Sequence, residues 1–298
     1  PLEYDSIYIY NSDFVKVNQD GKFGLINYDN EVIIPIEYDD VDLFHEGLSM
    51  VIKDDLSGFV NLKGRIAIPL EFDPPGQSAF SSNLSAFKEG LAVVSKNSKQ
   101  GVIDKKGHVV IPFQYEELSN FSEGLSIVKN KDKYGFINLS NELVVPYKYD
   151  KAFNFSDGLA LVKEKDRYGF IDKFNNIVIP IEYNKAQSFS NGLALVEKQG
   201  DDSPFLIVKD KSAGNFYFIN KSNEIVLNLD YEMVLPVVNG FASVYNDGKV
   251  GFINTLGEVA IGFEYDSVPL ANSFSDGTAY VQKGREWFYI DRQGKRLD

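Results

Sequence analysis

Residues 155–188 decide the fold, and they read FSDGLALVKEKDRYGFIDKFNNIVIPIEYNKAQS. Three apolar runs, 159–162, 168–172 and 177–183, are rich in β-branched and aromatic residues and alternate with polar turns. Runs of this kind are typical of short strands, and no helical period is present. The stretch therefore predicts three strands, and a weaker fourth that ends near Ser188.

The same pattern returns eight times in the 298 residues. Steps between the marker residues of the second strand are 34, 43, 34, 34, 48, 34 and 37 residues, which gives a base period of 34. A fixed period in this range indicates one supersecondary unit stacked many times. We therefore predict an all-β fold of eight tandem β-meander repeats in a single array over residues 1–298. The marker residues are Gly24, Gly58, Gly101, Gly135, Gly169, Tyr217, Gly251 and Phe288.

The arrangement of the array has two alternatives, a closed β-propeller-like ring and an open superhelical β-repeat stack. The ring is favoured because the chain starts at the proline of a third strand and stops just before the same place. Pro1 then follows Gly294 as Pro112 follows Gly107, so that one repeat is split between the two termini. The open stack is favoured by the poor match of 295–298 to 108–111.

Recurrent glycines and prolines predict local backbone geometry. The Asp-Gly and Asn-Gly pairs before the first strand, such as Asp157-Gly158, predict turns with positive φ. A glycine inside the second strand indicates a bulge or the close packing of another group, and we expect an aromatic ring from the next repeat. The third strand carries a proline, which indicates an edge strand or bulge. Because the apolar runs are nearly continuous, we expect both faces of each sheet to be covered.

The composition excludes several classes of function. The net charge is −13, from 30 basic and 43 acidic residues, which argues against nucleic-acid binding. The chain has no cysteine, so disulfides, thiolate catalysis and zinc–thiolate sites are excluded. No apolar run is long enough for a membrane-spanning helix, so we expect no membrane insertion. The compartment, cytoplasmic or exported, stays open, because the chain begins at Pro1 and an N-terminal targeting segment is not seen.

The residues that usually carry catalysis are sparse. The two histidines, His45 and His108, are far apart in the sequence. No nucleophile elbow, phosphate-binding loop or His-Glu-x-x-His motif is present. We therefore predict a non-enzymatic protein with no catalytic residues, cofactor or metal site.

The repeat resembles the bacterial WG-repeat family. The resemblance lies in an aromatic–glycine pair after Gly-Leu-Ala-x-Val, followed by Ile-Asp and by Ile-Pro-x-x-Tyr. The aromatic–glycine pairs are Phe23-Gly24, Tyr134-Gly135 and Tyr168-Gly169, whereas Trp287 is followed by phenylalanine. The resemblance covers essentially the whole chain. It implies an interaction or ligand-binding role in a bacterial protein, and it supplies no catalytic residues.

Two polar positions recur once per repeat. The Asn or Asp that closes the second strand, such as Asn27 or Asp172, predicts a side-chain cap on the following turn, with a metal-binding ring as the alternative. A carboxylate also follows the repeated aromatic residue. It predicts either a turn or an acidic rim that faces a basic partner or cation. Its members are Asp5, Asp39, Asp73, Glu116, Asp150, Glu232 and Asp266.

The insertions interrupt an otherwise regular array, so we predict that segments 73–86 and 198–215 form the recognition site. Both contain phenylalanine and carboxylates, a mixture that suits an apolar anchor with a polar rim. The run 205–208 is either a loop or an extra strand. The candidate partner-binding residues are Asp73, Phe80, Asp201, Asp202 and Phe205, with Asp39, Glu116 and Asp150 on the acidic rim as the alternative.

Taken alone, the sequence favours a repeat scaffold that mediates protein–protein interaction. The alternative is a carbohydrate-binding, lectin-like module, for which the 17 tyrosines and the many carboxylates are suited. A glycoside hydrolase, with paired carboxylates in a central channel, is a third hypothesis.

Overall fold

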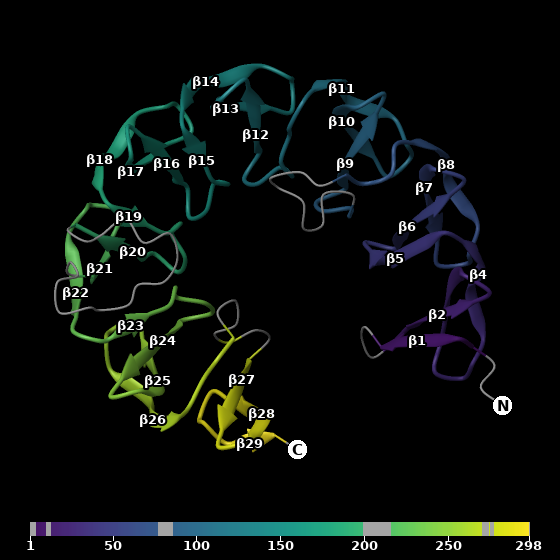
Figure 1. Cartoon of the computed structure of the whole chain (residues 1–298). Helices are drawn as coiled ribbons and strands as arrows, with labels where there is room; N and C mark the ends of the chain where they lie inside the picture. Colours follow the sequence, from purple (N-terminus) through teal and green to yellow (C-terminus); the bar gives the residue numbers. More distant parts are fainter. Residues whose placement is uncertain are drawn as a thin grey trace. The chain divides into compact units, whose positions relative to one another are not determined.

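The computed structural model describes residues 4–9, 13–76, 86–198, 216–269, 274 and 277–297. In these ranges the strands form eight small sheets, one per repeat, and each sheet is built from consecutive strands (Figure 1). Five of these sheets have four strands and three have three. The predicted all-β fold of eight meander repeats is confirmed.

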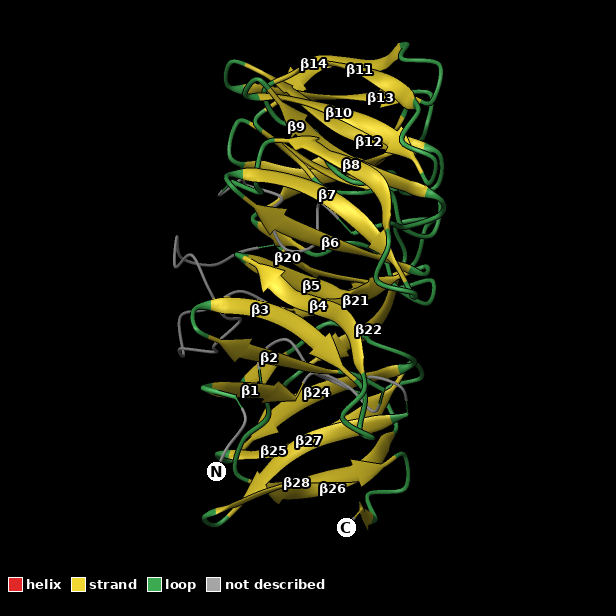
Figure 2. Cartoon of the chain, turned by 90° about the vertical axis from the view of Figure 1, so that its right-hand side faces the viewer, coloured by secondary structure: helices red, strands yellow, loops and turns green. Residues whose placement is uncertain are grey.

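Strands and loops account for all of the described chain (Figure 2). A helix able to cross a membrane is absent from the described ranges. The first two sheets contain β1 (Ser6–Ile9), β2 (Val15–Gln19), β3 (Lys22–Ile26), β4 (Val32–Tyr38), β5 (Asp40–His45), β6 (Leu48–Lys53), β7 (Leu56–Asn61) and β8 (Ile66–Phe72). The next two contain β9 (Leu91–Lys96), β10 (Lys99–Asp104), β11 (Val109–Tyr115), β12 (Leu125–Asn130), β13 (Lys133–Asn138) and β14 (Leu143–Tyr149).

The fifth and sixth sheets contain β15 (Lys151–Ala152), β16 (Ala160–Glu164), β17 (Arg167–Ile171), β18 (Ile177–Tyr183), β19 (Lys185–Ala186), β20 (Ala194–Glu197), β21 (Phe216–Ile219) and β22 (Ile225–Leu229). The last two contain β23 (Met233–Val234), β24 (Phe241–Asn246), β25 (Lys249–Asn254), β26 (Val259–Tyr265), β27 (Thr278–Lys283), β28 (Glu286–Asp291) and β29 (Arg296–Leu297).

The chain divides into two compact units, Pro1–Tyr147 and Lys148–Asp298. The boundary falls inside β14, so the repeat pattern passes from one unit to the next without a linker. The single array, the repeat shared between the termini and the closed ring stay predictions.

The weaker fourth strand of the repeat belongs to a different sheet from the one that the sequence suggests. In residues 155–188 this segment is β19, and it pairs with β20 of the following sheet, Ala186 opposite Val196. The sheet boundary therefore lies at the aromatic residue Tyr183. Each four-stranded sheet begins with this strand and ends with the apolar third strand of the repeat, which carries a proline in β4, β8 and β18 but not in β22 or β26.

The core lies between successive sheets. Phe170 of β17 packs with Phe189 and Val196 of the next repeat, and the two rings meet edge to face with centroids 4.8 Å apart. Burying one such side chain contributes about 1.5–3 kcal/mol. Because every sheet in the described chain is small, this contact between repeats supplies the apolar burial that one sheet alone lacks.

The last strand of each sheet is covered less than we expected. In β18, Ile179 is buried, but Ile177 and Val178 are exposed. The expectation that both faces are covered holds for the two middle strands and is wrong for this one. The physical reason is position, because a strand at the edge of a sheet lies beyond part of the neighbouring sheet.

The Asp-Gly turns have the predicted backbone. Asp157 and Gly158 both have positive φ, 54° and 85°, as a two-residue type I′ hairpin turn requires. The Asp157 side chain also accepts a 2.7 Å hydrogen bond from the backbone N–H of Gly192, which occupies the same place in the next repeat. The turn therefore links two repeats as well as two strands.

The glycine inside the middle strand faces a bulge, as predicted. A Cβ at Gly169 would lie 2.7 Å from Ile181 Cα and 2.8 Å from the Ile179 carbonyl oxygen. The pairing of β17 with β18 shifts register here, with Phe170 opposite Ile179 and Ile171 opposite Ile177. The group that approaches belongs to the last strand of the same sheet, so the expected aromatic ring from the next repeat is wrong.

Candidate protein-binding surface

Part of the predicted site lies outside the described residues. This applies to Phe80, Asp201, Asp202 and Phe205, and to the run 205–208. The role of the two insertions therefore stays a prediction. The remaining candidates, Asp39, Asp73, Glu116 and Asp150, are all described.

These carboxylates lie where the chain passes from one sheet into the next. Most of them accept a hydrogen bond from a backbone N–H in a hairpin turn of the sheet that follows, such as the turn between β6 and β7. The bonds run to Asp39 from Asp54 (2.8 Å), to Asp73 from Ser98 (2.7 Å) and to Asp150 from Lys165 (2.8 Å). Asp5, Glu232 and Asp266 accept equivalent bonds from Asp20, Gly248 and Gly284.

A lysine of the preceding sheet joins several of these contacts. Lys22 pairs with the second oxygen of Asp39, and Lys99 lies 3.6 Å from Glu116. The hydrogen bond from Lys22, followed by the one from the Asp54 N–H, holds the pKa of Asp39 below its ordinary value. A basic partner at the acidic rim would have to compete with these internal donors.

In each repeat, an Asx residue stands at the end of the strand that carries the marker residue, such as β17. This Asx residue caps the following turn, as predicted. In all eight copies the side-chain oxygen accepts backbone N–H groups two and four residues later. Asp172, for example, accepts from Phe174 at 2.9 Å and from Asn176 at 2.8 Å. The other seven are Asn27, Asn61, Asp104, Asn138, Asn220, Asn254 and Asp291.

In most repeats, the residue four places after the Asx residue carries the complementary hydrogen-bonding group, so that a donor faces an acceptor. Asn220 donates from its amide to the Glu224 carboxylate at 2.7 Å, whereas Asp172 accepts from the Asn176 amide at 2.8 Å. We did not predict this rule from the sequence, although the spacing is visible in the repeats. Four of the five Asn residues are followed by Glu, at 31, 142, 224 and 258, whereas Asn61 is followed by Arg65. The three Asp residues are followed by His108, Asn176 and Lys295.

Both histidines make local contacts within their own repeat. His108 is exposed, and its Nδ1 lies 3.0 Å from Asp104 Oδ2. Burial opposes ionisation of Asp104, but hydrogen bonds from the backbone N–H groups of His108 and Lys106 outweigh it and lower the pKa of Asp104. His45 ends β5 and pairs with Leu48 across a hairpin. In the described chain no group of three or more His, Asp or Glu residues could hold a metal ion.

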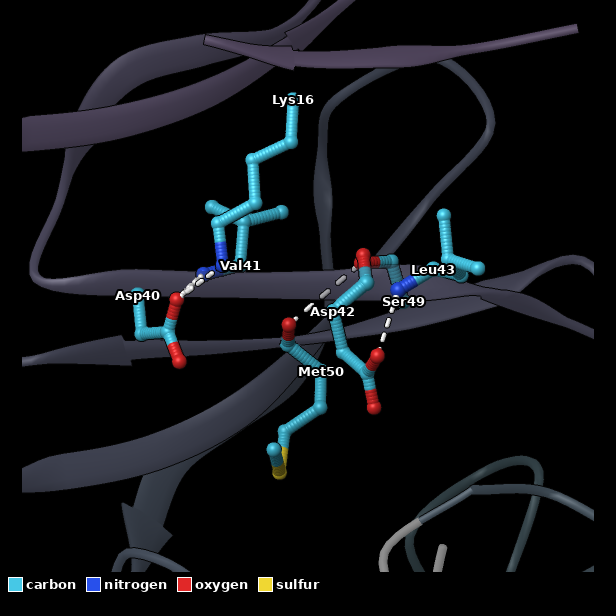
Figure 3. Close-up of polar contacts among 7 residues, drawn as sticks. All are labelled: Lys16, Asp40, Val41, Asp42, Leu43, Ser49 and Met50. Carbon is cyan, nitrogen blue, oxygen red and sulfur yellow. Dashed lines mark hydrogen bonds and ion pairs between the residues drawn. The ribbon is translucent and has the colours of Figure 1, made fainter. Parts of the chain in front are cut away.

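Polar contacts also join neighbouring sheets in the first unit (Figure 3). The Lys16 side chain is only 11% exposed, and its amine pairs with Asp40 of the next sheet and lies 4.7 Å from the centre of the Phe23 ring. The Asp40 carboxylate also accepts the Val41 N–H at 2.9 Å. A buried ammonium is tolerated because both a carboxylate and an aromatic face compensate it.

A second link between sheets recurs near the repeated aromatic residue. The residue before the repeated aromatic forms an ion pair with a residue of the following sheet. This partner lies at the end of β6, β9, β16 or β27, or just after β20. One pair, Lys148–Glu164, has its charges reversed relative to the others, which indicates that the pairing itself is required. The others are Glu37–Lys53, Glu71–Lys96, Glu182–Lys198 and Glu264–Lys283.

An exposed aliphatic side chain begins the last strand of seven sheets, and we call this set of equivalent positions, four in the first unit and three in the second, the apolar ridge. Its members are between 46% and 57% exposed. Exposed apolar residues from the preceding Asx turn, such as Phe174 and Leu256, extend it. The sequence analysis missed the ridge because a continuous apolar run was interpreted as buried. The ridge consists of Val32, Ile66, Val109, Leu143, Ile177, Ile225 and Val259.

The repeats match a known family model. The model described as WG containing repeat matches residues 1–23, 23–56, 58–73, 101–134, 134–168, 168–200, 218–249 and 251–287, which is more than half of the chain. No curated protein matches the chain.

Several solved structures are similar at low identity. A crystal structure of the eukaryotic initiation factor is 9% identical, with a TM-score of 0.46 and coverage of 97% of this chain and 96% of that one. Hsv2p of Kluyveromyces lactis is 11% identical, with a TM-score of 0.44 and coverage of 84% and 93%. Apo AztD of Citrobacter koseri is 14% identical, with a TM-score of 0.40 and coverage of 98% and 92%.

Proposed function

We propose that this chain, which belongs to the WG containing repeat family, is a non-enzymatic scaffold that binds a protein partner. The apolar ridge carries the proposal. It repeats an exposed aliphatic side chain in seven sheets, although the fold needs only the buried positions of the same strands. Exposed apolar side chains that gather into a contiguous patch are typical of interaction surfaces, and equivalent positions in successive repeats are where such a patch would form.

The polar groups of the Asx turns and of the acidic rim support a binding role over a catalytic one. The Asx side chains, Asp104 with His108, and Asp39 with Lys22 all form internal contacts. A catalytic site needs a carboxyl group or a base that faces the substrate. The pKa of a catalytic carboxylic acid is commonly raised. Where the pKa of a described Asp is shifted, as in Asp39, Asp104, Asp172 and Asp266, the shift is downward.

Site-specific photocrosslinking tests the proposal. A photoreactive residue at Ile177 or Ile66 should form a covalent adduct with a partner in cells of the source organism. The matched control is the same residue at Asp166, whose side chain is 94% exposed in the hairpin turn at the opposite end of the strands. We expect adducts from the ridge positions, and loss of the adduct when the neighbouring ridge residue is changed to Lys.

The proposal fails if the ridge positions give no adduct, or the same adducts as position 166. Recognition would then lie on the insertions 73–86 and 198–215 or on the acidic rim around Asp39, Glu116 and Asp150. Deleting each insertion back to the 34-residue period would separate these two surfaces.

A specific observation also favours the carbohydrate-binding alternative. On the last described sheet, Tyr280 stacks on Trp287 with ring centres 5.2 Å apart and lies 4.7 Å from Tyr289. Trp287 and Tyr289 are 40% and 53% exposed. Flat aromatic faces of this kind can pack against the C–H groups of a sugar ring, while the tyrosine hydroxyls form hydrogen bonds.

A glycan array with the intact chain tests this alternative. We expect a Trp287→Ala, Tyr289→Ala double variant to lose any glycan signal, and Phe174→Ala, an exposed aromatic elsewhere, to keep it. A signal that survives the double variant would exclude these rings as the sugar site.

A further inference from the structure

Most sheets protect their outer edge in two ways. The last strands β4, β8, β11, β14 and β18 each contain a proline, which has no N–H to offer to an added strand. Four of these strands, β4, β8, β11 and β18, also shift register twice against their neighbour. Prolines and bulges are the usual devices that prevent a further chain from pairing with an exposed edge.

The sheet β19–β22 lacks the proline and one of the two register shifts. Asn228 occupies the place of the proline, and Tyr217 occupies the place of the middle-strand glycine. Phe216 pairs with Leu229, Tyr217 with Asn228 and Phe218 with Leu227 in continuous register, and the ladder shifts once, between Phe218 and Ile219. Within the described part of the chain, no strand pairs with the other edge of β22.

The remaining last strands are less suited to accept a strand. β26 has Gly262 in place of the proline but keeps both register shifts. β29 is described over only two residues, Arg296 and Leu297. Among the described last strands of five or more residues, β22 therefore combines the absence of the proline with a ladder that is regular across the proline position.

The surroundings of β22 indicate the chemistry of an incoming strand. Ile225 and Val226 are 57% and 42% exposed. Residues 221–249 include four carboxylates and two lysines, Lys221 and Lys249, so the local charge is negative. The carboxylates are Glu224, Asp230, Glu232 and Asp247.

We propose that β22 accepts an extended segment of a protein partner as an additional strand of its sheet. The segment places aliphatic side chains beside Ile225 and Val226, and Lys or Arg residues near Glu224 and Asp230. Main-chain hydrogen bonds provide affinity in this mode, and the side chains and flanking charges provide specificity. This inference rests on the proposed scaffold function and specifies it, because Ile225 is also a member of the apolar ridge.

A second copy of the chain is a poorer occupant. Pairing β22 with itself would bring Glu224 and Asp230 of one copy against the same carboxylates of the other. Like charges across an interface oppose association. A basic, aliphatic strand meets the same edge with opposite charge.

A defined peptide tests the proposal on the intact chain. The probe is a fluorescein-labelled peptide of sequence KKVTIVVKK, and the readout is fluorescence anisotropy. We expect saturable binding, weakened at least tenfold by Asn228→Pro, since this change removes the N–H and restores the residue that five other repeats carry. A second variant, Ile225→Lys with Val226→Lys, changes only exposed side chains and should weaken binding by a similar factor.

Three controls complete the design. Pro180→Asn in β18 removes a proline but keeps the bulge, so binding should stay at the wild-type level. The peptides KKVTPVVKK and EEVTIVVEE should bind at least tenfold more weakly, because the first interrupts the added ladder and the second reverses the charge. Thermal unfolding midpoints of the variants verify that each is folded.

Two results would overturn the inference. Wild-type binding by both variants, or equal binding of the proline-containing peptide, would show charge adsorption rather than strand addition. Dimerisation of the free chain that Asn228→Pro abolishes would assign the edge to a second copy. Neither result affects the ridge, so the absence of any adduct at the ridge positions is a separate failure, and it identifies the scaffold proposal as the faulty one.

Discussion

The neighbouring sheets β15–β18 and β19–β22 share strand order and core packing but differ at one edge. In the first, Gly169 allows β18 to bulge against β17, and Pro180 lies in the bulged strand. In the second, Tyr217 pairs regularly with Asn228, and the register shifts only once, between Phe218 and Ile219. The small residue in the middle strand therefore accompanies two register shifts, and the large one accompanies a single shift.

Two other sheets separate the roles of glycine and proline. The pair β25–β26 has Gly251 but no proline, and its register still shifts twice. The pair β28–β29 has Phe288 in place of the glycine, and Tyr289 and Ile290 pair without a shift. The register shift at the glycine position is therefore present with Gly251, although β26 has no proline, and absent with Tyr217. A Cβ at the glycine position would collide with the backbone of the last strand.

The largest expected effect tests whether the two sheets share one kind of core. Phe170 and Phe218 occupy equivalent positions and are almost completely buried. Phe170→Ala and Phe218→Ala should each lower the free energy of unfolding by about 3–5 kcal/mol. Urea denaturation measures both. Phe174→Ala, at an 84% exposed position, is the control and should change the free energy by less than about 0.5 kcal/mol. Clearly unequal losses at 170 and 218 would show that the difference between the sheets extends into the core.

The glycine itself gives the next effect. Gly169→Val should cost about 1–3 kcal/mol, because the new side chain would overlap the Ile179 carbonyl and Ile181. Gly262→Ala is the matched control, since a Cβ there has no heavy atom within 4 Å. Chemical denaturation compares the two. A neutral Gly169→Val would mean that the bulge does not depend on the glycine.

The Asx turns give a smaller difference between the two sheets. Asn220→Asp should cost about 1 kcal/mol, because it replaces a donor to Glu224 with a second carboxylate. Adding Glu224→Asn should restore most of the loss, because the pair then matches Asp172 with Asn176. A double-mutant cycle on the free energy of unfolding measures the coupling. If the two changes are additive, the matching rule is wrong.

The smallest effect concerns the junction carboxylates and pH. Because the pKa of Asp39 is lowered in the folded chain, its contribution is present above the ordinary Asp pKa and is lost as pH falls through the folded value. Asp39→Asn should therefore reduce the loss of stability in acid. Lys22→Met, which removes the main cause of the shift, should have the same effect. Urea midpoints between neutral pH and about pH 2 test both, and an unchanged pH dependence in either variant would contradict the assignment.

Local features could be predicted from the sequence alone. The 34-residue period, the Asp157-Gly158 turn, the cap at Asp172 and the bulge beside Gly169 were all predicted, and the structure confirms them. Each depends on the backbone preference of one residue or on hydrogen bonds that span a few residues. Short-range geometry of this kind depends on the residues of the turn or strand itself.

The tertiary structure decided what depends on a neighbouring sheet. β19 joins the following sheet because its pairing partner, β20, comes later in the chain. Ile177 and Ile179 belong to the same apolar run, but only Ile179 is covered. Asp39 meets Lys22 across a sheet boundary. Burial and pairing between repeats depend on which surfaces face each other, and the residue type at one position does not specify that.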